Sequence, residues 1–216
     1  VLPARLGHPL GQRLIQRLFA FFVGYLRWTG LACFDFRGLA SLRDWRGGII
    51  VANHPCLLDV VFLVSQLPRV FCLMKAAVLS NLVLCGTARL AGYVVNHSAR
   101  GIVTHCAARV RAGDTLLIFP EGTRTVEAVV NPFKLGFALV AQLSAAPVQT
   151  VFIESNSPFL GKSWPFHKPP ASFPLRYSFK LGERFAPPLE GGAKDFGRTV
   201  EDYFRTSLSP RAKPGD

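Results

Sequence analysis

The sequence is short of acidic residues, and this imbalance limits the partners that the protein can have. It contains 13 Asp and Glu against 25 Lys and Arg, which gives a formal net charge of +12 and a pI near 10.1. Such a charge attracts polyanions, among which anionic lipid surfaces and nucleic acids are common. Zinc-finger spacings, RNA-binding signatures and platforms of alternating aromatic and basic residues are all missing. An anionic membrane surface is therefore the expected partner, and nucleic acid is not.

The cysteines form no CxxC motif and no other spacing typical of metal ligands. All five lie in apolar segments, so the sequence predicts buried, reduced thiols and a reducing, cytoplasmic compartment. They are Cys33, Cys56, Cys72, Cys85 and Cys106. No metal site is expected.

The sequence also lacks a clear membrane span or signal peptide. Residues 10–34 are helical and apolar but interrupted by arginines, and the charge-free run at 18–26 is shorter than the roughly 18 residues that a span requires. No small-residue cleavage site follows it. Aromatic residues mixed with arginines predict instead an amphipathic helix in the membrane interface, with a helix packed on the domain as the alternative. Residues 135–153 are free of charge, but Pro147 and polar residues divide them into helix, turn and strand.

Strands and helices alternate along the rest of the chain. The expected strands are 34–38, 48–52, 69–75, 93–95, 116–119, 146–151 and 175–181. One helix is expected to begin at Pro55, and four further helices are expected at 78–90, 100–111, 132–144 and 195–208. This order predicts a single α/β domain with a mostly parallel sheet flanked by helices, whose site lies at the carboxyl ends of the strands.

The domain organisation expected from these patterns has three parts. Residues 1–34 form the membrane-associating helical segment, 35–208 the α/β domain and 209–216 a disordered tail. The clean alternation at 175–181 predicts a half-exposed edge strand. The loop at 154–174 is rich in Pro, Ser and aromatic residues, and its Trp164 and Lys162 are expected to touch a membrane or to cover a substrate, if the loop is not an ordinary one.

His54 and Asp59 follow the apolar strand at 48–52 directly. Pro55 suits the first position of a helix, so His54 is expected just before the helix and Asp59 one turn inside it, within reach of the imidazole. A carboxylate on one ring nitrogen fixes the tautomer and stabilises the imidazolium form. His54 is therefore a candidate general base, and a capping histidine beside an unrelated Asp is the alternative.

A second apolar strand ends at Pro120 in a polar loop. The loop contains Glu121, Gly122, Thr123 and Arg124. A guanidinium is suited to bidentate phosphate recognition, and the glycine allows close approach of a ligand to the backbone. A glycine turn closed by a Glu–Arg ion pair is the alternative interpretation.

Taken together, NHPCLLD at 53–59 and FPEGTRT at 119–125 resemble the glycerolipid acyltransferase superfamily, the 1-acylglycerol-3-phosphate acyltransferase-like lysophospholipid acyltransferases. The resemblance runs from about Ile49 to Ile153. Lys75 and Gly86 match the lysine and glycine between the two motifs, FKLG at 133–136 is similar to the family's FKxG, and APVQTV at 146–151 is similar to its PVxPV strand.

One segment departs from the family pattern. The family's second motif should fall at Gly92, but the chain reads GYVVNHS there and has no arginine before Arg100. That arginine is associated in the family with the phosphate of the acceptor, so its absence argues against a lysophosphatidate-type acceptor. Arg100 is a candidate to substitute for it by a shift, and a solvated residue at the start of the next helix is the alternative. The segments AGY at 91–93 and RAGDTLLIFPEGTRT at 111–125 also resemble the sequences of family members associated with aryl polyene and related pigment pathways.

The resemblance implies direct acyl transfer. His54, oriented by Asp59, would remove a proton from the hydroxyl of a lysophospholipid or related membrane lipid, which then attacks the thioester of acyl-CoA or acyl carrier protein. Glu121, Gly122, Thr123 and Arg124 would position this acceptor, with Arg100 and Lys75 as further substrate-binding candidates. No GxSxG motif is present, so a covalent acyl-serine is not expected. The thioester is a co-substrate, and no other cofactor is expected.

The expected location is the cytoplasmic face of the inner membrane, as a peripheral or monotopic protein. Two other functions remain open at this point. A basic membrane-binding protein that has lost the acceptor site would keep the same fold without activity. A thioester hydrolase would use the same His–Asp pair to activate water.

Overall fold

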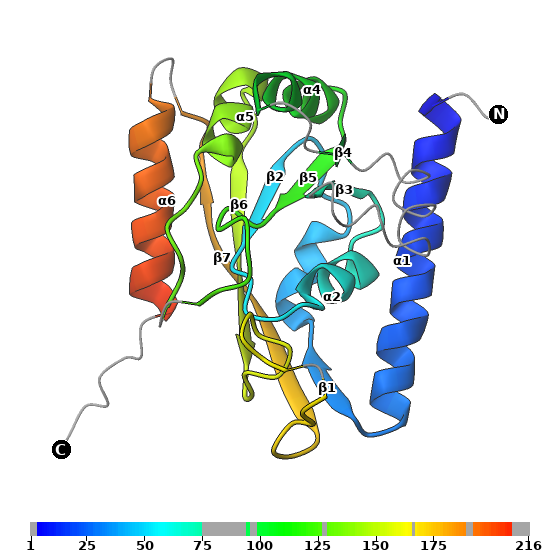
Figure 1. Cartoon of the computed structure of the whole chain (residues 1–216). Helices are drawn as coiled ribbons and strands as arrows, with labels where there is room; N and C mark the ends of the chain where they lie inside the picture. Colours follow the sequence, from blue (N-terminus) through cyan, green and yellow to red (C-terminus); the bar gives the residue numbers. More distant parts are fainter. Residues whose placement is uncertain are drawn as a thin grey trace.

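The computed structural model describes residues 4–74, 94–95, 99–126, 129–165, 167–188 and 192–208. Its centre is a seven-stranded sheet in the order β1-β7-β6-β2-β5-β3-β4 (Figure 1). The strands are β1 (Ala32–Asp35), β2 (Ile49–Ala52), β3 (Val70–Met74), β4 (Val94–Val95), β5 (Thr115–Ile118), β6 (Val148–Ser155) and β7 (Leu175–Phe185).

The sheet is mostly parallel, as the sequence predicts. Strand β2 pairs in parallel with β5 and β6, and β3 pairs in parallel with β5 and β4. Strand β7 runs antiparallel to β6 and parallel to β1. The carboxyl ends of β2, β5 and β6 therefore lie at one edge of the sheet, where the loops that follow them meet.

Helices cover both faces of the sheet. Those described are α1 (Ala4–Trp28), the 3-10 helix η1 (Arg37–Leu42), α2 (Asp59–Gln66), α4 (Ala99–Arg111), α5 (Gly136–Ser144) and α6 (Ala193–Leu208). Helices α1 and α2 lie on one face, and α4, α5 and α6 lie on the other (Figure 1). The fold is thus a single α/β domain of three layers.

Strand β2 shows why the apolar runs of this sequence do not alternate with polar residues. Ile50 packs in the same cluster as residues of α1 and α2, whereas Ile49 and Val51 pack in the cluster formed with α4, α5 and α6. All four residues of the strand are buried. A parallel strand covered by helices on both faces needs apolar side chains at every position.

Two strand predictions are wrong in position. Strand β7 is not an edge strand, because β1 pairs with it on its outer side and leaves it between β1 and β6. The strand expected at 34–38 begins at Ala32 and ends at Asp35. Its end has a local cause, since the Asp35 carboxylate accepts the backbone N–H of Arg37 at 3.1 Å and turns the chain into η1.

Two helices begin later than the sequence indicates. Helix α2 begins at Asp59 and not at Pro55, because the Asp59 carboxylate accepts the N–H of Cys56 at 2.7 Å and holds the preceding residues in a turn. Helix α5 begins at Gly136 and not at Pro132. The backbone N–H of Phe133 donates to the Glu201 carboxylate at 2.9 Å, so it makes no hydrogen bond within a helix.

Helix α1 ends at Trp28, six residues before the predicted boundary, and Gly30 follows it with a left-handed φ of 72°. Ile15 and Val23 are buried in the core cluster that contains α2. The opposite side of α1 exposes an apolar stripe at helical spacing: Leu10, Leu14, Leu18, Phe21, Tyr25 and Trp28. Among the described helices, none has both the length and the apolarity to cross a membrane.

The cysteines are placed only partly as predicted. Cys56, Cys72 and Cys106 are buried and reduced, but Cys33 is exposed on the edge strand β1. The helix expected at 78–90, which includes Cys85 and Gly86, lies outside the described residues, as do Lys75 and the tail at 209–216.

Candidate active site

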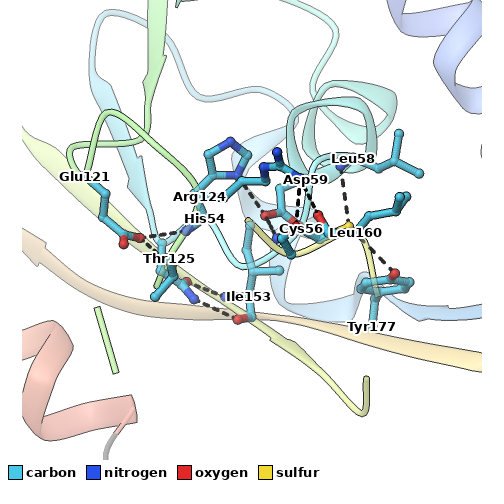
Figure 2. A network of polar contacts seen from close by, with 12 residues as sticks. His54, Cys56, Leu58, Asp59, Glu121, Arg124, Thr125, Ile153, Leu160 and Tyr177 are labelled. Atoms are coloured by element: carbon cyan, nitrogen blue, oxygen red, sulfur yellow. Dashed lines mark hydrogen bonds and ion pairs between the residues drawn. The ribbon is translucent and has the colours of Figure 1, made fainter. Parts of the chain in front are cut away.

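His54 lies immediately after β2, where the chain leaves the sheet. The side chain of Asn53 fixes this exit, because its amide bonds both the N–H and the C=O of Ile153 on β6 at 2.8 Å. His54 Nδ1 and Asp59 Oδ2 are 2.9 Å apart. Figure 2 marks this contact with a dashed line. The imidazole stacks on Phe119 at a centroid distance of 4.3 Å. The predicted contact between His54 and Asp59 is therefore present.

The Asp59 carboxylate sets the orientation of the imidazole. It is 0% exposed, and its Oδ2 accepts from both His54 and the N–H of Cys56. Burial raises the pKa of Asp59, while the hydrogen bonds from His54 and Cys56 oppose this rise. A neutral imidazole that donates from Nδ1 to this carboxylate keeps its unshared electron pair on Nε2. The His54 side chain is 18% exposed, so this arrangement can serve a general base.

The buried Glu121 joins the two motif loops. Its Oε1 accepts the N–H of His54 at 2.9 Å and the hydroxyl of Thr125 at 2.8 Å, and its Oε2 accepts the N–H of Asn131 at 2.9 Å. Figure 2 shows this carboxylate beside the backbone of His54. The Glu121–Arg124 ion pair considered from the sequence is not among the described contacts of either side chain. Glu121 instead holds the backbone of the candidate base in place.

Gly122 and Arg124 shape the loop that follows β5. Gly122 has a left-handed φ of 66°, which favours glycine, and a Cβ there would lie 2.8 Å from Lys134 Nζ. Arg124 Nη1 donates to the carbonyls of Leu160 and Gly161, each at 2.9 Å. The guanidinium thereby fastens the long loop that follows β6 against the loop that follows β5.

The long loop at 156–174 brings a lysine to this site that the motifs alone do not identify. Lys162 Nζ donates to the hydroxyl of Thr123 at 2.8 Å, and Trp164 packs against Phe159 in the same loop. The loop closes one side of a cavity of about 530 Å³. Asn53, Pro55 and Thr125 line its other side, so the cavity adjoins the backbone on either side of His54.

The structure gathers most of the predicted site residues at one edge of the sheet. His54, Asp59 and the loop at 121–124 lie together there. Arg100 is the second residue of α4, and its side chain is not described. Lys75 lies outside the described residues, so the proposed roles of these two basic residues stay predictions.

Cys56 lies within the first motif but is poorly suited to act as a nucleophile. It is buried, and its Sγ lies 3.8 Å from the hydroxyl of Tyr177. Burial and the charge of Asp59 raise the pKa of this thiol to about 11. The thiol is therefore protonated near neutral pH, where the thiolate would be the reactive form.

Comparison with known proteins places these loops in a family. The Acyltransferase family model matches residues 33–154, which is more than half of the chain. Two proteins of Caenorhabditis elegans carry provisional names as 1-acyl-sn-glycerol-3-phosphate acyltransferases. One, acl-1, is 26% identical over 150 residues, or 66% of this chain and 57% of that protein. The other, acl-2, is 24% identical over 161 residues, or 70% of this chain and 56% of that protein.

The chain thus spans a little over half of the length of these curated relatives. Among solved structures, it is similar to the 1-acyl-sn-glycerophosphate (LPA) acyltransferase PlsC from Thermotoga maritima. The TM-score is 0.69 at 18% identity, covering 94% of this chain and 83% of that one. At this identity the likeness concerns the α/β fold alone. Because the family match includes both motif loops and the strands that carry them, the chain belongs to the Acyltransferase family.

Proposed function

We propose that the protein transfers a fatty acyl group from a thioester, acyl-CoA or acyl carrier protein, to a hydroxyl of a lysophospholipid or related glycerolipid. The observation that carries this proposal is the 2.9 Å contact between Asp59 and a partly exposed His54. Membership of the Acyltransferase family and the names of the C. elegans relatives support acyl transfer to a 1-acylglycerol-3-phosphate-like acceptor.

In the proposed mechanism, His54 Nε2 removes the proton of the acceptor hydroxyl as its oxygen attacks the thioester carbonyl. The new C–O bond gives a tetrahedral oxyanion, and Asp59 stabilises the imidazolium that forms. Collapse of the intermediate breaks the C–S bond, and the imidazolium returns its proton to the leaving thiolate. The ester and the free thiol are the products, so atoms and charges balance without any cofactor besides the thioester.

The acceptor would bind in the 530 Å³ cavity beside His54. Lys162 presents an exposed ammonium group there, next to the hydroxyl of Thr123. One nitrogen of Arg124 already bonds two carbonyls, so in this geometry Arg124 positions the loop that carries Lys162. Thr123 and Lys162, together with the predicted Arg100 and Lys75, are the groups we assign to the polar head of the acceptor.

The test is thiol release from acyl-CoA and from acyl carrier protein by membrane-reconstituted protein, with and without lysophosphatidate or lysophosphatidylcholine. Release that requires an acceptor and yields the diacyl lipid is the expected result. Equal release without acceptor, with free fatty acid as the product, would identify a hydrolase. Failure of every donor and acceptor pair would leave a non-catalytic membrane-binding protein.

We also propose that α1 lies in the interface of the cytoplasmic leaflet. Its exposed stripe includes Phe21 and Trp28, which are 78% and 85% exposed, and Arg13 and Arg17 are exposed between apolar residues. Arginines and aromatic residues together suit an interfacial helix. The charge of +12 adds attraction to anionic lipid.

Replacing Phe21 and Trp28 by serine should weaken binding to vesicles of phosphatidylglycerol and phosphatidylethanolamine by about tenfold or more. Burial of each large apolar side chain contributes about 1.5–3 kcal/mol, and partial insertion of two exceeds the ~1.4 kcal/mol that corresponds to tenfold. Co-sedimentation measures the binding. A matched control changes Leu139 and Leu143, exposed residues of α5 on the other face, to serine. Equal loss in both double variants would contradict a specific role for α1.

A further inference from the structure

A second cavity of about 900 Å³ opens at the same edge of the sheet, on the face covered by α1 and α2. Its walls come from the end of α1, from β1 and η1, and from the paired ends of β6 and β7. We propose that it binds the phosphorylated nucleotide end of the acyl donor, which makes coenzyme A, and not a carrier protein, the donor. This inference rests on the proposed acyl transfer and names its co-substrate.

The two carboxylates that line the cavity are already neutralised. Asp35 is held by Arg37, with Oδ1 accepting from Nε at 2.9 Å and Oδ2 from Nη2 at 2.6 Å. Glu154 pairs with Lys180 at 2.6 Å. The acidic residues therefore do not balance the remaining basic residues of the lining.

Those remaining basic residues are three arginines: Arg27, Arg43 and Arg176. Arg27 donates to the carbonyl of Phe34 at 2.8 Å, and none of the three has a carboxylate partner among the described residues. They come from α1, the end of η1 and β7, so they converge from separate elements. Guanidinium groups that line one cavity from separate elements are suited to several phosphate oxygens at once.

The floor of the cavity is aromatic. Phe34 stacks with Phe36 at 5.4 Å and 6°, and with Tyr177 at 5.5 Å and 14°. The guanidinium of Arg27 lies 5.3 Å from the centroid of Phe36 and 5.6 Å from that of Phe34. A flat base can extend such a stack while its phosphates meet the arginines. A phosphate without a ring would leave the aromatic floor unused, so the lining favours a nucleotide over a lipid head group.

The cavity adjoins the candidate active site at the carboxyl end of β6. Glu154 and Ser155, at the carboxyl end of β6, line both the 900 Å³ cavity and the 530 Å³ cavity. The smaller cavity includes Asn53 and Pro55, the neighbours of His54. An extended thiol arm anchored by its nucleotide in the larger cavity can therefore pass the end of β6 and bring its thioester to His54.

The test pairs a site variant with a control of equal charge change. Arg43→Gln with Arg176→Gln removes two cavity guanidiniums, and Lys194→Gln with Arg198→Gln removes two exposed charges from α6 on the other face. Calorimetry with adenosine 3′,5′-bisphosphate should show binding at least about tenfold weaker in the site variant and unchanged in the control, because charge-assisted contacts are lost. Glycerol 3-phosphate should bind the native protein weakly.

Kinetics and labelling give independent readouts. In the site variant, KM for acyl-CoA should rise at least about tenfold while kcat stays within threefold, and KM for acyl-pantetheine, which lacks the nucleotide, should not change. Cys33 is exposed and lines the cavity, so adenosine 3′,5′-bisphosphate should slow its alkylation, measured by peptide mass spectrometry.

The outcomes separate the two proposals. Nucleotide binding that is equal in native and site-variant protein overturns the inference, as does glycerol 3-phosphate binding as tightly as the nucleotide, which would indicate a lipid head-group site. Acyl transfer with an unchanged KM for acyl-CoA in the site variant supports the proposed function but rejects the nucleotide site. Arginine-dependent nucleotide binding without any acyl transfer supports the site and rejects the proposed function.

Discussion

Replacing His54 by alanine is expected to lower kcat for acyl transfer by about 10²- to 10⁴-fold, the range typical of a general base. The reason is that the imidazole of this residue is partly exposed, pairs with Asp59 and lies between Asn53 and Pro55, which line the cavity. The measurement is acceptor-dependent thiol release at saturating donor. His105→Ala is the matched control, since that histidine is exposed on α4 and outside the site.

Asp59→Asn tests whether the carboxylate contributes through His54. The amide keeps the size of the side chain but removes the charge that stabilises the imidazolium, so kcat should fall by about 10²-fold or more. Because Asp59 is completely buried, far-UV circular dichroism must show that the variant is folded. Native kcat in a folded His54→Ala or Asp59→Asn protein would reject the general-base assignment.

The contact between His54 and Asp59 could be predicted from the sequence because it is local. The two residues are separated by one turn, and both follow a run of apolar residues that predicts a strand. The details of that turn could not be predicted. Helix α2 starts at Asp59 because its carboxylate accepts the N–H of Cys56, and propensity gave no indication of this side-chain contact.

The contacts that complete the site connect residues far apart in the sequence. Arg124 reaches the carbonyl of Leu160, 36 positions away, and Glu121 reaches His54, 67 positions away. Such contacts depend on β2, β5 and β6 being neighbours in the sheet. The hydrophobic pattern of a strand indicates which of its faces is buried, but not which other strand pairs with it. The same limit explains the wrong edge assignment of β7, since nothing in the pattern at 175–181 reveals its partner β1.

Glu121→Ala is expected to lower the free energy of unfolding by about 3–5 kcal/mol, the summed cost of several donors left without their acceptor. Three donors lose their acceptor: the N–H groups of His54 and Asn131 and the hydroxyl of Thr125. Each buried donor left without a partner costs about 1–3 kcal/mol, less where water enters. For a chain of this size, the change corresponds to a Tm lower by roughly 10 °C. Denaturant and thermal unfolding provide the measurement, and Glu183→Ala, an exposed glutamate on β7, provides the control.

The effect of Glu121→Ala on catalysis separates a structural role from substrate binding. If Glu121 contacted the acceptor directly, its removal would raise KM for the acceptor and leave Tm nearly unchanged. In the structure its oxygens bond protein donors instead, and one of them is the backbone N–H of the candidate base. We therefore expect Tm and kcat to fall together, because the backbone that carries the imidazole loses its anchor to the second loop. Glu121→Gln should fall between native and alanine proteins, because one carbonyl acceptor remains while the amide group faces another donor.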